Sequence, residues 1–159
     1  MSYLKIAVVS DTHGSEINIL EFINKIGRID MIIHLGDCVD DVRFIRRHYN
    51  GKIISVRGNC EDIAREPLVI NEVIENIRFI ICHGHSFGVK KSIMGYLYKA
   101  LENEAKIALF GHTHIEAIED IEGVLLINPG SLSRSLGKGN SYCVIEIDGS
   151  EIHSNIVYL

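Results

Sequence analysis

Short apolar runs recur along this chain, and each of the first five is followed by a segment that combines glycine with Asp, Asn or His. The apolar runs are Ile6 to Val9, Met31 to Leu35, Ile53 to Val56, Phe79 to Cys82, Ile107 to Phe110 and Val124 to Ile127. Their continuous apolarity is typical of central strands that are covered on both faces. The pattern therefore predicts a layered protein in which polar side chains gather where buried strands end.

Helical periodicity lies between the early runs. Ile19, Ile23 and Ile26 share one helical face, and the same pattern predicts a second helix from Val42 to Tyr49. A third helix is expected over Lys90 to Leu101. Strands that alternate with helices form parallel crossovers, so the beginning of the chain is predicted to be a parallel α/β arrangement.

Tight turns between apolar segments predict hairpins. Leu68 to Ile74 and Ile77 to Cys82 flank a Glu-Asn turn, and Tyr142 to Ile147 and Ile152 to Val157 flank an Asp-Gly turn. The fold class that follows is α/β (α+β mixed), with parallel strands at the beginning and antiparallel strands towards the end.

Composition limits the classes of partner. The 159 residues are 47% hydrophobic and suffice for a single domain over residues 1–159. No apolar run approaches the roughly 20 residues of a membrane helix, so no membrane partner and a cytoplasmic location are expected. The four cysteines form no CxxC pair and are expected to be reduced. A net charge of −5 argues against long nucleic acids, whereas a small phosphate ester and a homo-oligomer are both compatible with the sequence.

The residues that follow the apolar runs are of the types that bind divalent metal ions. In open α/β folds, ligands bind beyond the carboxyl ends of the strands. At these positions the chain has Asp11, His13, Asp37, Asn59, His83, His112 and His114. In an extended segment alternate side chains point the same way, so the D-x-H and H-x-H pairs are each expected to converge on one ion. Mixed nitrogen and oxygen ligands suit Mn, Fe, Co, Ni or Zn rather than Ca.

Together these segments resemble the calcineurin-like metallophosphoesterase family. The family pattern of D-x-H, G-D, G-N-H-[DE], a later H and G-H-x-H is matched almost completely from Asp11 to His114. Asn128-Pro129-Gly130-Ser131 resembles a later segment of the family, and Gly58-Asn59-Cys60-Glu61 is most similar to the YfcE-like branch of small phosphodiesterases. The resemblance implies a metallophosphoesterase-like fold, a four-layer sandwich of two mixed β-sheets flanked by helices.

The resemblance also implies roles for individual residues. The first metal ion would be held by Asp11, His13 and His114 and the second by Asn59, His83 and His112, with Asp37 bridging them. The implied catalytic set is Asp37, Asn59, Cys60 and His83, with no organic cofactor. Two divalent ions, with Mn or Ni favoured by the resemblance, would activate a bridging hydroxide for in-line attack on a small phosphodiester.

Cys60 departs from the family pattern. At this place the family usually has a histidine that assists the leaving group. A neutral thiol, with a pKa near roughly 8.5, is a poorer partner for an anionic oxygen than an imidazolium is. The hypothesis that follows is that poor leaving groups react slowly and that activated or cyclic diesters are favoured.

The remaining histidines have other expected roles. His34 lies inside a strand and is expected to be a hydrogen-bonded core residue, and His48 and His153 are expected at the surface. For His85, a structural role and a role beside a ligand or a phosphate stay equally open. For Arg134, a structural role is favoured over a phosphate contact.

Two other functions remain open from the sequence. A phosphomonoesterase acting on a metabolite needs the same metal ions with stronger recognition of a dianionic group. A protein-binding scaffold is the second alternative, because the retromer subunit Vps29 resembles this fold. The seven ligands favour catalysis, since a scaffold does not require them.

Overall fold

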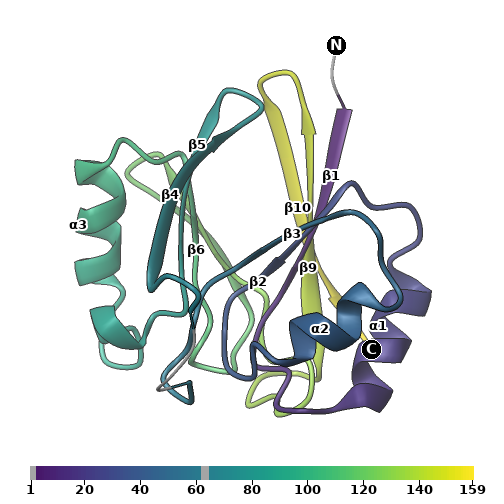
Figure 1. Ribbon diagram of the computed structural model, residues 1–159. Helices are drawn as coiled ribbons and strands as arrows, with labels where there is room; N and C mark the ends of the chain where they lie inside the picture. Colours follow the sequence, from purple (N-terminus) through teal and green to yellow (C-terminus); the bar gives the residue numbers. More distant parts are fainter. Residues whose placement is uncertain (1–2, 62–64) are drawn as a thin grey trace.

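Residues 3–61 and 65–159 are described by a computed structural model, in which two β-sheets pack face to face between helices (Figure 1). The first sheet contains β1 (Tyr3–Val9), β2 (Met31–His34), β3 (Lys52–Ser55), β9 (Ser141–Asp148) and β10 (Glu151–Tyr158). The second contains β4 (Val69–Ile74), β5 (Ile77–Cys82), β6 (Ile107–Leu109), β7 (Ala117–Ile121) and β8 (Val124–Asn128). The helical elements are α1 (Glu16–Lys25), α2 (Asp41–Arg46), α3 (Met94–Glu102) and a 3₁₀ turn, η1 (His85–Phe87).

Both sheets combine parallel and antiparallel pairs. The first has the order β10-β9-β1-β2-β3, in which β1, β2 and β3 are parallel and the pairs made by β9 are antiparallel. The second has the order β4-β5-β6-β8-β7, in which β5, β6 and β8 are parallel and both edge pairs are antiparallel. Parallel strands end at the same edge of a sheet, so the loops that follow them gather there.

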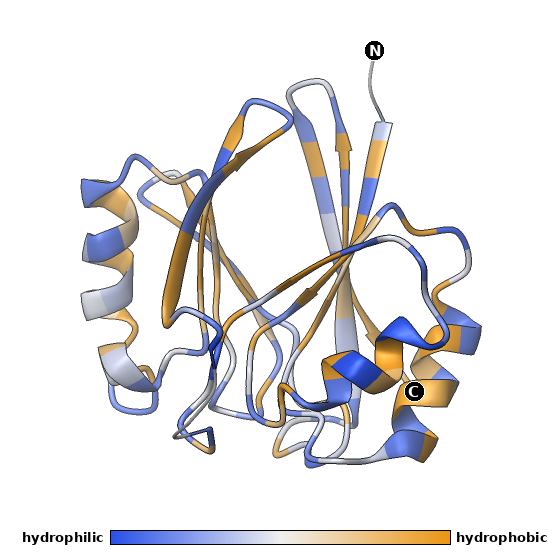
Figure 2. Ribbon diagram, viewed as in Figure 1, coloured by the Kyte–Doolittle hydropathy of each residue, from blue (hydrophilic) through white to orange (hydrophobic). Residues whose placement is uncertain are grey.

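Side chains alternate between the centre of the sandwich and its outer faces. In β1, Ile6 and Val8 belong to the apolar cluster between the sheets, whereas Ala7 and Val9 pack in a second cluster with Phe22 of α1. Both faces of the strand are buried, which explains the continuous apolar runs seen along the ribbon in Figure 2. The layers are α1 with α2, the first sheet, the second sheet and α3 (Figure 1), so the predicted four-layer fold is confirmed.

The helix α3 covers the outer face of the second sheet. Tyr96, Leu97 and Ala100 are buried in the cluster that lies against this face. The Tyr96 hydroxyl lies 2.6 Å from the Leu109 carbonyl oxygen and 3.0 Å from that of Ile80, so its donor is satisfied inside the core. The helix is thereby fixed to β5 and β6, the strands that lead into the loops described below.

The second helix is shorter than predicted. It ends at Arg46, whereas the apolar pattern extended it to Tyr49. The N–H groups of Arg47 and His48 bond to carbonyls three residues back, which tightens the last turn and ends the helix. Tyr49 keeps an apolar contact without being helical, and its hydroxyl donates to the Ile29 carbonyl oxygen at 3.3 Å.

The second sheet and the helix that covers it differ from the sequence pattern at two places. The helix α3 begins at Met94 instead of Lys90, because the N–H groups of residues 91 and 92 bond to the Gly88 carbonyl in a turn and the Ser92 hydroxyl then accepts from the Met94 N–H. The strand β7 was not predicted. It is a half-exposed edge strand with acidic residues, so a search for apolar runs does not find it.

All four cysteines are free, and Cys82 and Cys143 are buried in the core. Within residues 3–61 and 65–159, no helix has both the length and the apolar character needed to cross a membrane.

Candidate metal centre

Five loops that leave the carboxyl ends of parallel strands meet where the edges of the two sheets adjoin. They follow β1, β2, β3, β5 and β6, and they contain all seven predicted metal ligands. Backbone hydrogen bonds join them in pairs. The Asp11 N–H donates to the Gly36 carbonyl at 3.0 Å, and the Gly111 N–H donates to the His83 carbonyl at 2.8 Å. The loops are therefore held in register by the backbone itself.

The backbone at most of these positions is left-handed. The φ angles are 54° at Asp11, 45° at His13, 57° at Asp37, 67° at His112 and 58° at His114. Extended backbone was expected in the D-x-H and H-x-H motifs, and that expectation was wrong, because both motifs form left-handed turns. Asp11 and His13 still belong to one ligand cluster, whereas His112 and His114 belong to different clusters, so the expected convergence of the H-x-H pair on one ion was also wrong. Such conformations cost energy in non-glycine residues and cluster at functional sites.

Four of the side chains form a first cluster, made of Asp11, His13, Asp37 and His114. One ligand atom from each lies within 4.8 Å of all the others. Nε2 of His114 lies 3.0 Å from Oδ1 of Asp11, and Nε2 of His13 lies 3.6 Å from the same oxygen. Atoms that are each about 2.1 Å from a common ion lie roughly 3 to 4 Å apart, so the spacing fits one transition-metal ion.

A second cluster contains Asp37, His83 and His112, whose ligand atoms also lie within 4.8 Å of one another. Nε2 of His83 is 3.2 Å from Nδ1 of His112 and 3.5 Å from Oδ2 of Asp37. Oδ1 of Asn59 joins this cluster at 3.1 Å from the same Nε2. Asp37 belongs to both clusters, so they adjoin through its carboxylate.

Backbone carbonyls orient two of the histidine rings. Nδ1 of His83 lies 2.8 Å from the Leu35 carbonyl oxygen, and Nδ1 of His114 lies 2.9 Å from that of Arg134. A carbonyl only accepts, so in each neutral ring Nδ1 carries the proton and Nε2 is an acceptor. Each Nε2 then faces further acceptor atoms from carboxylate and amide groups. A set of converging acceptors fits a cation.

His13 adds independent support for a cation. Its Nε2 atom is buried and has no hydrogen-bond partner among the described residues, although the carboxylates of Asp11 and Asp37 lie 3.6 and 3.8 Å away. Buried polar atoms are nearly always bonded to a partner. The side chains present therefore fit metal ions at this place.

The charges of the centre are mutually stabilised. Burial works against ionisation of Asp11, yet the adjacent rings of His114 and His13, when protonated, hold the pKa of this carboxyl far below its usual value. Burial likewise disfavours a charge on His83, but the nearby carboxylates of Asp37 and Asp11 raise the pKa of its ring. The carboxylates are consequently ionised at neutral pH.

Residues beyond the seven hold the ligand turns in place. Nδ2 of Asn128 donates to the Gly111 carbonyl at 3.1 Å and to Oγ1 of Thr113 at 2.9 Å, which braces the H-x-H turn. The Ser131 hydroxyl donates to the Asp11 carbonyl at 2.8 Å. The Asn-Pro-Gly-Ser segment, whose resemblance suggested proximity to the site, thus supports two ligand turns.

Glu61 is a supporting residue that sequence reasoning missed. Its carboxylate accepts from the N–H of Val39 at 2.8 Å and from that of Gly58 at 2.5 Å, so it joins the loops after β2 and β3. A Cβ atom added at Gly58 would lie 2.0 Å from Oδ1 of Asp37, which shows how closely this loop passes the shared carboxylate. The available signal was the acidic position that ends the G-N-C-E motif.

The family model of the calcineurin-like phosphoesterase superfamily domain matches residues 4–150. The chain belongs to this family. The resemblance inferred from the motifs is confirmed, and the chain is a metal-dependent phosphoesterase. Divalent metal ions are implied by the family, and the Asp and His clusters can hold them.

Two relatives of the phosphoesterase are similar over most of its length. A probable metallophosphoesterase of Mycoplasma pneumoniae is 33% identical over 155 residues, which cover 93% of this chain and 92% of the relative. A phosphodiesterase of Methanocaldococcus jannaschii is 31% identical over 147 residues, which cover 80% of this chain and 83% of the relative.

Solved structures share the fold. A predicted phosphoesterase of Streptococcus pneumoniae has a TM-score of 0.83 and 30% identity, and the match covers 99% of this chain and 91% of that one. Vps29 of Entamoeba histolytica complexed with Zn²⁺ has a TM-score of 0.78 and 20% identity, with 97% and 98% covered. At that identity the likeness to Vps29 concerns the fold alone.

Cys60 of the phosphoesterase lies at the rim of the centre. Its side chain is exposed, and its backbone N–H donates to Oδ1 of Asp37 at 3.2 Å. Partial desolvation and the charge of Asp37 raise the pKa of the Cys60 thiol to about 11. The thiol is therefore neutral beside the shared carboxylate in the metal-free protein.

The histidines outside the centre lie where they were expected. His34 is fully buried, its Nδ1 accepts from the Gly36 N–H at 3.1 Å, and its Nε2 lies 3.0 Å from the Thr12 hydroxyl. Burial lowers the pKa of His34 to about 4. His48 and His153 are exposed. The predictions for these three residues are confirmed.

His85 and Arg134 both lie near the ligands. Nδ1 of His85 is buried without a partner among the described residues, and the ring centre is 5.5 Å from that of His83 and 6.1 Å from that of His112. The ring thus borders the second cluster with an unbonded nitrogen. Arg134 acts through its backbone carbonyl, which orients His114.

Proposed function

We propose that this phosphoesterase is a phosphodiesterase that depends on two metal ions and acts on small phosphodiesters. The observation that carries the proposal is that Asp37 belongs to both ligand clusters. A carboxylate shared by two adjacent sets of acceptors is suited to join two ions. Two divalent ions bring four positive charges and Asp11 and Asp37 offset two of them, so the centre would attract a phosphate ester.

The proposed ligands form two sets that share one member. Asp11, His13 and His114 would hold one ion, Asn59, His83 and His112 the other, and Asp37 both. Bound ions would lower the pKa of water and offset the charge of the phosphoryl oxygens. The protein contributes the positions of these atoms, because the carbonyls of Leu35 and Arg134 fix the rings of His83 and His114 with Nε2 towards the carboxylates.

Two features favour a small phosphodiester as substrate. A relative with 31% identity bears the name phosphodiesterase. Cys60 places a thiol beside Asp37, at the position where the family has the histidine that assists the leaving group. Such a site suits leaving groups that need little protonation, as in activated or cyclic diesters.

The scaffold alternative is less well supported. The likeness to Vps29 concerns the fold alone. The ligand clusters bring buried, ionised carboxylates close to a buried nitrogen of His13 that has no hydrogen-bond partner among the described residues. Such groups destabilise a fold unless they serve a ligand. A phosphomonoesterase would use the same ions, so the comparison of substrates separates it from a diesterase.

The test is a metal-by-substrate screen. Protein stripped with a chelator is reloaded separately with Mn, Ni, Fe, Co or Zn and assayed for metal content. Hydrolysis of bis-p-nitrophenyl phosphate, 2′,3′-cyclic nucleotides and p-nitrophenyl phosphate is then compared. We expect two ions per chain and faster hydrolysis of the diesters. Saturation at one ion would contradict the dinuclear site, faster monoester hydrolysis would favour the monoesterase, and no hydrolysis at full metal content would favour the scaffold.

A further inference from the structure

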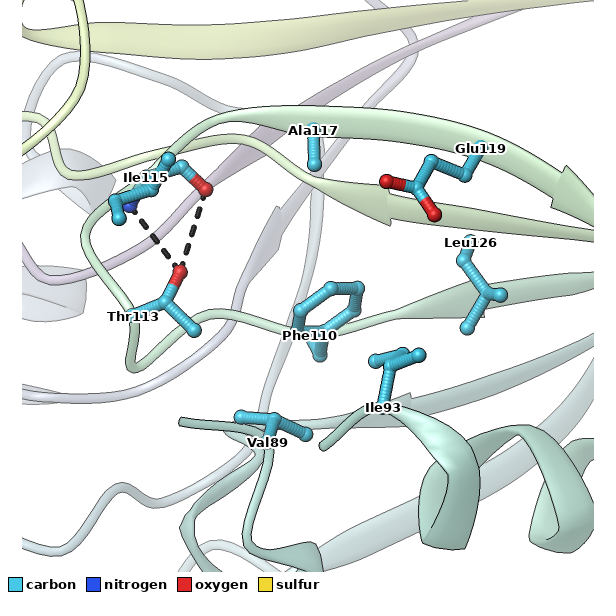
Figure 3. Close-up of a pocket in the computed structure, with 8 residues that line it drawn as sticks. All are labelled: Val89, Ile93, Phe110, Thr113, Ile115, Ala117, Glu119 and Leu126. Atoms are coloured by element: carbon cyan, nitrogen blue, oxygen red, sulfur yellow. Dashed lines mark hydrogen bonds between the residues drawn. The ribbon is translucent and has the colours of Figure 1, made fainter. Parts of the chain in front are cut away.

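A pocket of about 240 Å³ lies on the outer face of the second sheet, beside the segment that leads into α3 (Figure 3). Phe110, Ala117 and Leu126 contribute apolar walls, and Glu119 is the charged residue among those that line it. The Glu119 side chain has no hydrogen bond or ion pair within the described parts of the chain. The pocket therefore combines an apolar interior with a carboxylate acceptor at its border.

One end of this pocket lies at the turn that carries two of the candidate metal ligands. Thr113 and Val89 line that end, opposite Glu119 in Figure 3. Thr113 lies between the two histidines of the H-x-H turn, so one short segment contributes to both the pocket and the metal clusters. Lys90 follows Val89 in the chain and is exposed.

The size and chemistry of the pocket limit its occupant. Pockets for whole drug-sized ligands have volumes of roughly 300 to 1,000 Å³, so this one suits a single ring system. Phe110 offers an aromatic ring, on which a flat base can stack. The Glu119 carboxylate accepts hydrogen bonds and donates none. An aromatic ring that carries an amino donor matches these walls, as the bases adenine, cytosine and guanine do.

We propose that the pocket binds the base of a nucleoside phosphodiester whose phosphate lies at the metal centre. The inference rests on the phosphodiesterase function proposed above and specifies its substrate class. Thr113 marks the boundary between the base and phosphate subsites. A metabolite without a base, or an apolar group without a donor, is the competing occupant.

Binding of adenosine to the metal-free protein tests the pocket by itself. Backbone amide signals are followed by NMR during titration with adenosine, with ribose and with anisole, which has an aromatic ring but no hydrogen-bond donor. We expect adenosine to shift the signals of Thr113 and Ala117 and to bind roughly tenfold more tightly than anisole. Ribose should cause no shift. Equal affinity for anisole, or no shift with adenosine, would overturn the proposal.

Variants of β7 provide matched controls. Ala117→Phe fills the pocket and should weaken adenosine binding at least tenfold, with unchanged metal content showing that the protein is folded. Glu119→Ala should weaken adenosine binding several-fold, whereas Asp120→Ala, which alters a neighbouring acid that does not line the pocket, should leave it unchanged. Unchanged binding in both pocket variants would refute the assignment.

The two proposals can be contradicted independently of each other. Adenosine lacks a phosphate and the titration uses protein without metal, so binding does not depend on hydrolysis. Adenosine binding without diester hydrolysis would support the pocket and overturn the phosphodiesterase. Hydrolysis of bis-p-nitrophenyl phosphate without adenosine binding would support the phosphodiesterase and overturn the pocket.

Discussion

Nε2 of His83 lies 3.5 Å from Oδ2 of Asp37, although the two residues follow strands of different sheets. Asp37 comes from the loop after β2, and His83 comes directly after β5. The candidate metal centre therefore depends on how the two sheets pack. Each sheet supplies part of the ligand set, and neither supplies all of it.

Asp37→Asn tests the shared carboxylate. The substitution keeps the size of the side chain and removes its charge, so we expect loss of most bound metal. Activity should fall by more than the roughly 10- to 100-fold that partners behind the ligands typically contribute. Elemental analysis and diester hydrolysis measure both effects, with Asp40→Asn, an exposed neighbour, as control. Near-normal metal content in Asp37→Asn would remove Asp37 from the ligand set.

Gly58→Ala tests the close approach of the loop after β3 to Asp37. The added Cβ would meet the Asp37 carboxylate at 2.0 Å and its backbone nitrogen at 2.6 Å, so one of the two loops must move. We expect a loss of about 1 to 3 kcal/mol in the free energy of unfolding and reduced metal content. Gly95→Ala is the control, because its Cβ would meet only the Phe87 carbonyl at 3.6 Å within a helix. Equal behaviour of the two variants would contradict the crowding argument.

Cys60→Ser and Cys60→His test the leaving-group hypothesis. A histidine can be charged near neutral pH and can assist a poor leaving group, whereas serine stays neutral. We expect Cys60→His to raise the rate on alkyl esters relative to p-nitrophenyl esters, and Cys60→Ser to keep the original preference. Rates on matched ester pairs decide between these outcomes. Identical rate ratios in all three proteins would show that Cys60 does not influence the leaving group.

His34 should make stability depend on pH. Its pKa is lowered to about 4 in the fold from 6.5, so between these values the unfolded chain binds a proton that the folded protein does not. This contribution is complete above about pH 6.5, decreases as the pH falls towards about 4, and amounts to about 3 kcal/mol. Urea unfolding of wild type and His34→Gln is measured at several pH values. The free energy of unfolding of the wild type, relative to that of the variant, should increase by this amount as the pH rises from about 4 to about 6.5.

The control for the pH dependence is His48→Gln, in which an exposed histidine is replaced. The free energy of unfolding of this variant should depend on pH as that of the wild type does. If His34→Gln also kept the pH dependence of the wild type, the burial of a neutral His34 would not be its source.

Local patterns in the sequence predict every described strand except β7, and they identify the candidate ligands. Ile6 to Val9 is recognisable as a buried strand because both of its faces pack in apolar clusters. Asp11 and His13 follow it directly, and their polar side chains stand out against the apolar run. These are local patterns of about ten residues, and the physical chemistry of side-chain burial makes them readable without coordinates.

How those residues meet depends on contacts between distant parts of the chain. The left-handed backbone of His112 is held by contacts with segments far away in sequence, such as the bonds of Asn128 to its turn. The sharing of Asp37 between two clusters and the bracing of its loop by Glu61 likewise join separate loops. Left-handed turns are stabilised here by contacts across the fold, and no local pattern encodes such contacts, so the geometry of the centre follows from the packing of the two sheets.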